Sequence, residues 1–205
     1  MSHTLARALV LACLLAFAAI RLLFRRAKGP REQLRPRRER LLTRTMTVAV
    51  VLPALGWLGS PAEAWGDVPL PPALPWLGLL LAIAGLAGLA WSHATLGREF
   101  SPWLELLTEH RLVTSGPYRW VRHPMYTAGL VQTVGCGLLA ENVLVLGFPL
   151  LALGALILVR LPDEERMLHA RFGPTWEAWA QRTGRLLPRF EGWTTRPSPG
   201  PGPQG

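Results

Sequence analysis

The sequence has little charge, little acid and almost no cysteine, and each shortage excludes a class of protein. Only 17% of its 205 residues are charged, against about a quarter in a typical soluble domain, so an ordinary soluble fold is excluded. Half of the residues are apolar, which excludes disorder over most of the chain. The two cysteines, Cys13 and Cys136, both lie in apolar runs, which excludes a disulfide-stabilised secreted scaffold.

Long apolar runs are what the sequence has instead. A helix needs roughly 20 apolar residues to cross about 30 Å of hydrocarbon. Runs of this kind occur at Leu5–Phe24, Met46–Gly59, Leu74–Trp91, 126–140 and 143–160. Glu141–Asn142 separates the last two and is predicted to form the tip of a helical hairpin. We therefore predict an all-α, polytopic membrane protein with about five transmembrane helices.

The basic residues predict an orientation in the membrane. Apart from Arg7 and Arg21, every Lys and Arg falls in segment 25–44, in segment 93–123 or after residue 159, and five spans place all three on one face. The positive-inside rule assigns that face to the cytoplasm, which puts the N-terminus outside and the C-terminus inside the cell (inner) membrane. A cleaved signal peptide at residues 1–20 is the alternative, and it would leave four spans.

The charge of +9 does not indicate a nucleic-acid partner. The basic loop 25–44 has no aromatic residue for base stacking, so we interpret it as a topology determinant that contacts anionic membrane lipid. The predicted organisation is two N-terminal spans with this loop over 1–72, a core over 73–192, and a disordered Pro- and Gly-rich tail over 193–205.

The chemistry-bearing residues collect in two predicted cytoplasmic stretches, Leu96–Tyr126 and Arg160–Phe190. In the first stretch, Pro124 is predicted to begin a helix, with Arg122 and His123 beside its N-terminus. Free N–H groups and the helix dipole favour an anionic ligand there. Anchoring of the Tyr, Trp and Arg side chains at the membrane interface explains the same residues equally well.

The second stretch carries a candidate carboxylate. Arg160 and Glu164 stand four residues apart and share a helix face, provided that Pro162 does not break the helix. A carboxylate at the membrane edge can bind a ribose hydroxyl or a cation, although an acid-rich, solvated helix N-terminus is the alternative.

A stripe of apolar and aromatic residues follows the candidate carboxylate. Its spacing predicts a helical segment in the cytoplasmic interface, divided by Gly173-Pro174 into two short helices. The stripe consists of Leu168, Phe172, Trp176 and Trp179.

Two other patterns are assigned no ligand. Gly135-Cys-Gly137 lies inside a predicted span, where close helix packing explains it better than phosphate binding. The histidines show no metal-ligand spacing, so no metal site is predicted.

Several motifs occur together in a specific order, namely His110-x-Leu-Val-x-x-Gly-x-Tyr118, Arg122-His-Pro-Met-Tyr126, Glu164-Glu165, Phe172-Gly173 and Leu187-Pro188. This order resembles the isoprenylcysteine carboxyl methyltransferase and phospholipid methyltransferase superfamily, and Leu96-Gly-Arg98 resembles its bacterial branch. The resemblance covers roughly residues 75–190, so the first two spans lie outside it.

The resemblance implies an integral membrane enzyme that uses S-adenosylmethionine and has its active site on the cytoplasmic face. It places Glu164 on a polar group of the cofactor and Arg160 opposite the methyl acceptor. His123 is a candidate base only for an acceptor that is protonated. The cofactor-binding set that the motifs and the helix-start argument give is His110, Arg111, Leu112, Val113, Tyr118, Arg122, His123, Pro124, Met125, Tyr126 and Glu164.

The identity of the methyl acceptor is not predicted, because relatives methylate carboxylates, amines or thiols and nothing in the sequence chooses among them. A lipophilic or small-molecule acceptor is therefore expected. A membrane reductase with a nicotinamide cofactor would share part of the architecture but would need more spans. A non-catalytic scaffold is disfavoured because Tyr118, His123, Tyr126 and Glu164 are all present together.

Overall fold

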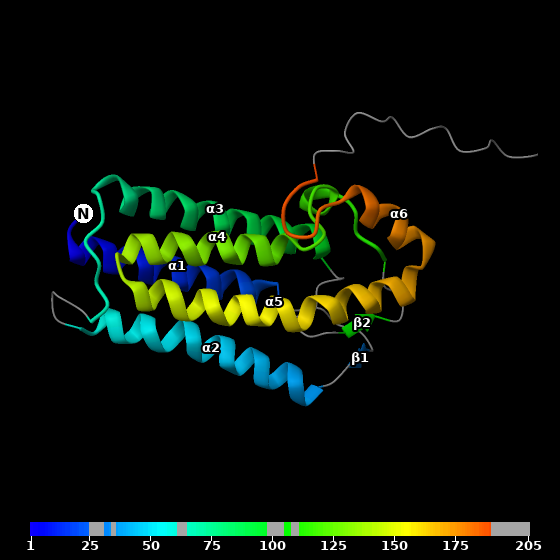
Figure 1. Ribbon diagram of the computed structural model, residues 1–205, viewed down its shortest axis with the longest axis horizontal. Coiled ribbons are helices and arrows are strands. Elements are labelled where there is room, and N and C mark those ends of the chain that lie inside the picture. Colours follow the sequence, from blue (N-terminus) through cyan, green and yellow to red (C-terminus); the bar gives the residue numbers. More distant parts are fainter. Residues whose placement is uncertain (25–30, 34–35, 61–64, 98–104, 108–110, 190–205) are drawn as a thin grey trace, which may run out of the picture.

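The computed structural model describes residues 1–24, 31–33, 36–60, 65–97, 105–107 and 111–189, and these form a bundle of long helices (Figure 1). The elements in chain order are α1 (His3–Leu23), β1 (Arg31–Gln33), α2 (Pro36–Leu58), α3 (Ala73–Leu96), β2 (Glu105–Leu107), η2 (Gly116–Arg119), α4 (Pro124–Ala140), α5 (Val143–Phe172) and α6 (Pro174–Arg182).

The helical membrane fold is confirmed. Among the described residues, α1, residues Arg40–Leu58 of α2, α3 and α5 are long and apolar enough to cross a membrane. The remaining apolar helix, α4, has 17 residues, which is the lower end of the range of about 17–25 that spans a bilayer. The number of five spans therefore stays a prediction.

Small residues bring α3 and α4 into close contact along the centre of the bundle. A Cβ atom added at Gly85 would lie 2.6 Å from the backbone nitrogen of Gln132, and one at Gly78 would lie 2.6 Å from that of Leu139. From the α4 side, a Cβ atom at Gly135 would meet the backbone of Ala82. The Gly135-Cys-Gly137 pattern thus serves helix packing, as the sequence predicts.

Replacing Gly85 with valine is expected to destabilise the bundle by about 1–3 kcal/mol, because the new side chain would force α3 away from α4. The measurement is the thermal unfolding midpoint of the purified protein in detergent. Gly147→Val on α5 is the matched control, since a Cβ atom at Gly147 would meet nothing within 4 Å. Equal midpoints for the two variants would contradict this account of the packing.

The predicted hairpin tip is present between α4 and α5. Glu141 takes the left-handed conformation that ends α4, with φ of 51°. Asn142 then begins α5, because its side-chain oxygen accepts hydrogen bonds from the backbone N–H groups of Leu144 and Val145. Asn142 also donates to Asp67, which ties this tip to the loop between α2 and α3.

The two ends of the bundle differ in charge. One end holds the start of α1, the end of α2 and the α4–α5 tip, where Asp67 and Glu141 lie (Figure 1). The other end holds η2, α6, the end of α1 and the start of α2, and these described elements carry the basic residues Arg21, Arg38, Arg119 and Arg182 (Figure 1). This segregation agrees with the predicted arrangement, whereas its assignment to the cytoplasm stays a prediction.

The structure corrects one prediction for the second stretch. Leu168 and Phe172 do not lie on a separate short helix, because α5 runs without a break from Val143 to Phe172. Pro162 lies inside α5 without ending it, so the helix continues beyond its apolar part as far as Phe172. Only the second predicted short helix, α6, is a separate element, and its interfacial position stays a prediction.

A second difference is a short antiparallel pair of strands. Residues Arg31–Gln33 of β1 pair with Glu105–Leu107 of β2, which an all-α prediction does not contain. Strands of three residues are too short to produce a detectable alternation of polar and apolar residues. The predicted tail 193–205 and part of the basic loop 25–44 lie outside the described residues.

Candidate functional site

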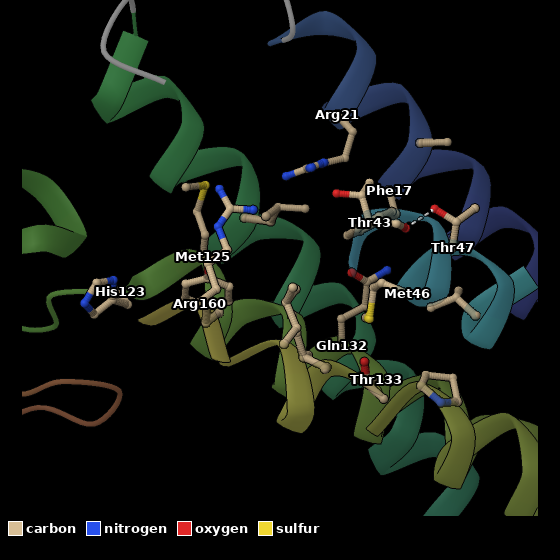
Figure 2. Close-up of a pocket in the computed structure, with 18 of the residues that line it drawn as sticks. Phe17, Arg21, Thr43, Met46, Thr47, His123, Met125, Gln132, Thr133 and Arg160 are labelled. Carbon is tan, nitrogen blue, oxygen red and sulfur yellow. Dashed lines mark hydrogen bonds between the residues drawn. The ribbon is translucent and has the colours of Figure 1, made fainter. Parts of the chain in front are cut away.

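A cavity of about 620 Å³ lies inside the bundle and is lined by residues from all five long helices, from segment 111–118 and from α6 (Figure 2). Its size falls within the range of about 300–1,000 Å³ that is usual for small-molecule pockets. It runs from the end of the bundle that carries η2 and α6 toward the α4–α5 tip, since both Tyr118 and Val145 line it.

Most of the predicted site residues meet at this cavity. Pro124 is buried at the start of α4 but does not line the cavity. His110 lies outside the described residues. The predicted residues that line the cavity are Arg111, Leu112, Val113, Tyr118, Arg122, His123, Met125, Tyr126, Arg160 and Glu164.

The predicted carboxylate stands between two basic groups. Glu164 Oε1 lies 3.6 Å from Arg160 Nε, as expected for residues one helical turn apart, and Glu164 Oε2 lies 3.6 Å from His123 Nδ1. These separations are longer than hydrogen bonds, so Glu164 keeps acceptor capacity toward the cavity. Arg160 and His123, the two predicted catalytic residues, therefore flank one carboxylate.

Both ring nitrogens of His123 face carboxylates. Its Nε2 atom lies 3.2 Å from Glu165 Oε1, opposite the nitrogen that faces Glu164. His123 therefore lies between the carboxylates of two consecutive residues of α5.

Glu165 belongs to the Glu164-Glu165 motif, but the sequence analysis assigned it no role. It accepts a hydrogen bond from Arg122 Nε at 3.0 Å and forms an ion pair with Arg185 at 2.9 Å. The same Arg122 side chain donates from Nη1 to the carbonyls of Ala180 and Thr183. Arg122 therefore joins the start of α4 to α5 and to the segment after α6.

Backbone hydrogen bonds complete this junction. The N–H groups of Arg122 and His123 donate to the carbonyls of Gly184 and Arg185. Figure 1 shows the segment after α6 folding back beside η2, at the end of the bundle that carries α6. These hydrogen bonds join the segment after α6 to the residues just before α4.

Tyr118 presents a buried hydroxyl to the cavity. The residue is 6% exposed, and its hydroxyl has no hydrogen-bond partner among the residues that the structure describes. Burial, followed by the negative charge of Glu164, raises the pKa of Tyr118, so its hydroxyl stays a donor. A buried donor without a protein partner is a place where a ligand can bind.

Trp179 of α6 also lines the cavity, which the helical stripe did not reveal. Its indole nitrogen donates to the carbonyl of Tyr118 at 3.2 Å and so holds segment 111–118 against α6. Trp179 and Leu168 are the members of the predicted stripe that reach the cavity. The stripe therefore contributes to the site wall.

The apolar part of the cavity comes from helices that carry no recognised motif. Residues of α1 and α2, such as Phe17 and Met46, face the interior together with α4 and α5 (Figure 2). Because α2 packs mainly against α5 while α1 packs against α3 and α4, the cavity extends between α1 and α2. A periodic apolar run predicts a span but does not reveal which of its faces lines a cavity.

Comparison with known proteins gives this site a family context. Residues 76–170 match the model of the isoprenylcysteine carboxyl methyltransferase (ICMT) family. The cobalt-zinc-cadmium resistance protein CzcN of Cupriavidus metallidurans is 35% identical over 119 residues, covering 56% of this chain and 52% of that protein. A probable protein-S-isoprenylcysteine O-methyltransferase of Oryza sativa subsp. japonica is 33% identical over 118 residues, covering 57% and 62%.

The chain thus spans between half and two thirds of the length of these relatives. A solved structure of the eukaryotic intramembrane Ras methyltransferase ICMT has a similar fold, with a TM-score of 0.53 and 24% identity over 78% of this chain and 55% of that one. The matched segment contains the motifs from His110 to Glu164 and both helices of the hairpin. Residues 76–170, a little less than half of the chain, are therefore similar to the isoprenylcysteine carboxyl methyltransferase family.

Proposed function

We propose that this chain is an integral membrane methyltransferase that transfers a methyl group from S-adenosylmethionine to a lipophilic or small acceptor at the cytoplasmic membrane face. The observation that carries the proposal is the single cavity that joins Tyr118, His123 and Glu164 to an apolar space between membrane helices. A polar pocket that continues into an apolar one suits a polar cofactor and an oily acceptor.

The residues at the polar end fit the cofactor. Glu164 has acceptor capacity for hydroxyl groups, and Tyr118 has a buried donor without a partner among the described residues. The side chains of Leu112 and Val113 provide apolar surface for a flat base. Tyr118 and Tyr126 supply aromatic rings, which stabilise a cation.

When bound, S-adenosylmethionine supplies an electrophilic methyl group on a cationic sulfur. The transfer is an in-line displacement, so the protein contributes positioning and exclusion of water more than acid or base catalysis. Arg160 lines the cavity beside Glu164 and is 9% exposed, which suits it to hold an anionic acceptor. A carboxylate or thiolate acceptor needs no base, in keeping with the two carboxylates that face His123.

The experiment that tests this function measures cofactor binding by the detergent-purified protein. Saturable binding of S-adenosylmethionine, no binding of NADPH, and transfer of a labelled methyl group to a lipid extract are the expected results. Binding of NADPH alone would overturn the proposal in favour of a reductase. Failure of a folded sample, in lipid nanodiscs, to bind either compound would overturn it in favour of a scaffold.

A further inference from the structure

The two cysteines of the chain, Cys13 and Cys136, lie far apart in the sequence but meet in the fold. Cys13 belongs to α1 and Cys136 to α4, and their thiols form a side-chain hydrogen bond with one another. Both are free thiols, and they pack with Ala82 of α3 in one buried cluster. Two thiols in contact need only a small movement to form a disulfide, whose sulfur atoms lie about 2 Å apart.

Close helix packing holds Cys136 in this position. The residue is flanked by Gly135 and Gly137 on α4. A Cβ atom added at Gly135 would clash with the backbone of Ala82, and one added at Gly137 would clash with Leu146 of α5. The backbone around Cys136 is therefore fixed against α3 and α5, while α1 packs on a further side of α4 and brings Cys13 to the thiol.

The two thiols differ in their access to the cavity. Cys136 lines it, whereas α1 contributes Val10, Leu11 and Leu14 to the described lining but not Cys13. Both cysteines are buried, with exposed fractions of 7% for Cys136 and 6% for Cys13. A reagent in the cavity therefore meets Cys136 first, and Cys13 lies behind it.

The surroundings of the pair favour an apolar reagent. On α4, the lining residues one helical turn before Cys136 are Gln132 and Thr133, which carry no charge. Within two turns of either cysteine along its own helix, no charged residue lines the cavity among the residues that the structure describes. A charged or strongly hydrated reagent loses hydration on entering such a space, whereas an apolar molecule gains by it.

We propose that Cys13 and Cys136 form a redox-active thiol pair, which an apolar organic hydroperoxide in the cavity oxidises to a disulfide that links α1 to α4. Cys136 is the residue that reacts with the peroxide, and Cys13 is the resolving residue, because only Cys136 of the two lines the cavity. This modification is a second chemistry of the protein, and it requires no S-adenosylmethionine.

The oxidation takes place in two steps. The Cys136 sulfur attacks one oxygen of the hydroperoxide, so an S–O bond forms, the O–O bond breaks, and an alcohol leaves with the thiol proton. The Cys13 sulfur then attacks the Cys136 sulfur, so the S–S bond forms, the S–O bond breaks, and water leaves with the second thiol proton. The two sulfur atoms lose the two electrons that the peroxide oxygens gain.

The test counts thiols in the full chain in phosphatidylcholine nanodiscs, before and after exposure to cumene hydroperoxide. Because the chain has two cysteines, loss of both thiols together with a mass decrease of two hydrogen atoms identifies this disulfide, and dithiothreitol is expected to restore both thiols. Hydrogen peroxide is the polar control. Relative to glutathione oxidised by each peroxide, it is expected to react about tenfold or more slowly than cumene hydroperoxide.

Single variants test the two roles. In Cys13→Ser, the thiol that lines the cavity has lost its partner, so oxidation should stop at the sulfenic acid of Cys136, which dimedone traps. In Cys136→Ser, the remaining Cys13 thiol is expected to be oxidised about tenfold or more slowly, because Cys13 does not line the cavity within the described part of the chain. Thermal unfolding midpoints establish that both variants are folded.

The measurements on the unmodified sequence are decisive even where a variant does not fold. Thiols that survive cumene hydroperoxide, or thiols lost without a reducible bond inside one chain, would overturn the proposal. A disulfide-linked dimer on a non-reducing gel would do the same. Equal relative rates for the two peroxides would contradict oxidation through the cavity, and equal rates for the two variants would contradict the assigned roles.

Discussion

Glu164→Gln is expected to weaken S-adenosylmethionine binding by about 100-fold or more and to leave the protein folded. Hydrogen bonds that involve a charged group contribute about 1.5–3 kcal/mol each, so loss of one such bond to a hydroxyl group and weakening of a second to a neutral bond correspond to this factor. Glutamine has the same shape but removes the charge and half of the acceptor capacity. Equilibrium binding of labelled cofactor to the detergent-purified protein measures the effect.

The geometry explains why folding should survive this substitution. Glu164 is 3.6 Å from both Arg160 and His123, and no hydrogen bond to Glu164 Oε2 is formed within the described residues. Glu177→Gln on α6 is the control, because this carboxylate is 53% exposed and does not line the cavity. Wild-type affinity in the Glu164→Gln variant would remove Glu164 from the site and leave Tyr118 as the principal polar contact.

The residues around Glu164 illustrate what the sequence can predict. The spacing of Arg160 and Glu164 places them on one helix face, and Pro124 predicts the start of α4, because both features depend only on local helix geometry. The apolar runs predict the long helices for the same reason. Local periodicity and capping thus give the elements and the polar end of the site.

The contacts of Glu165 illustrate what the sequence cannot predict. Arg122, His123 and Arg185 converge on this carboxylate from segments that lie more than 40 and about 20 residues away along the chain. The four-residue spacing that pairs Glu164 with Arg160 says nothing of these three partners of Glu165. In the same way, the sequence identifies α1 as a span, but only packing reveals that Arg21 faces the cavity.

The difference between these neighbouring glutamates leads to the expectation that Arg122→Ala destabilises the protein by about 3 kcal/mol. The substitution removes the hydrogen bond to Glu165 and those to the carbonyls of Ala180 and Thr183. The Arg122 and Glu165 side chains are 14% and 15% exposed, so water compensates these groups poorly, and breaking such a pair costs about 3–5 kcal/mol when it is fully buried. Thermal and denaturant unfolding in detergent measure the loss.

Arg122→Lys separates charge from geometry in this junction. Lysine keeps the positive charge but lacks the planar fork that reaches one carboxylate and two carbonyls at once, so only part of the stability should return. Arg182→Ala is the control, because Arg182 is exposed and donates within its own helix to Ala178. If Arg122→Ala unfolds like the wild type and loses only cofactor affinity, Arg122 is a ligand-binding residue and not the tie between α4, α5 and the C-terminal segment. We expect instead that Arg122→Ala lowers the stability and that cofactor binding falls only as far as the folded fraction does. This result would assign stabilisation of the site to Arg122 and recognition of the cofactor to Glu164.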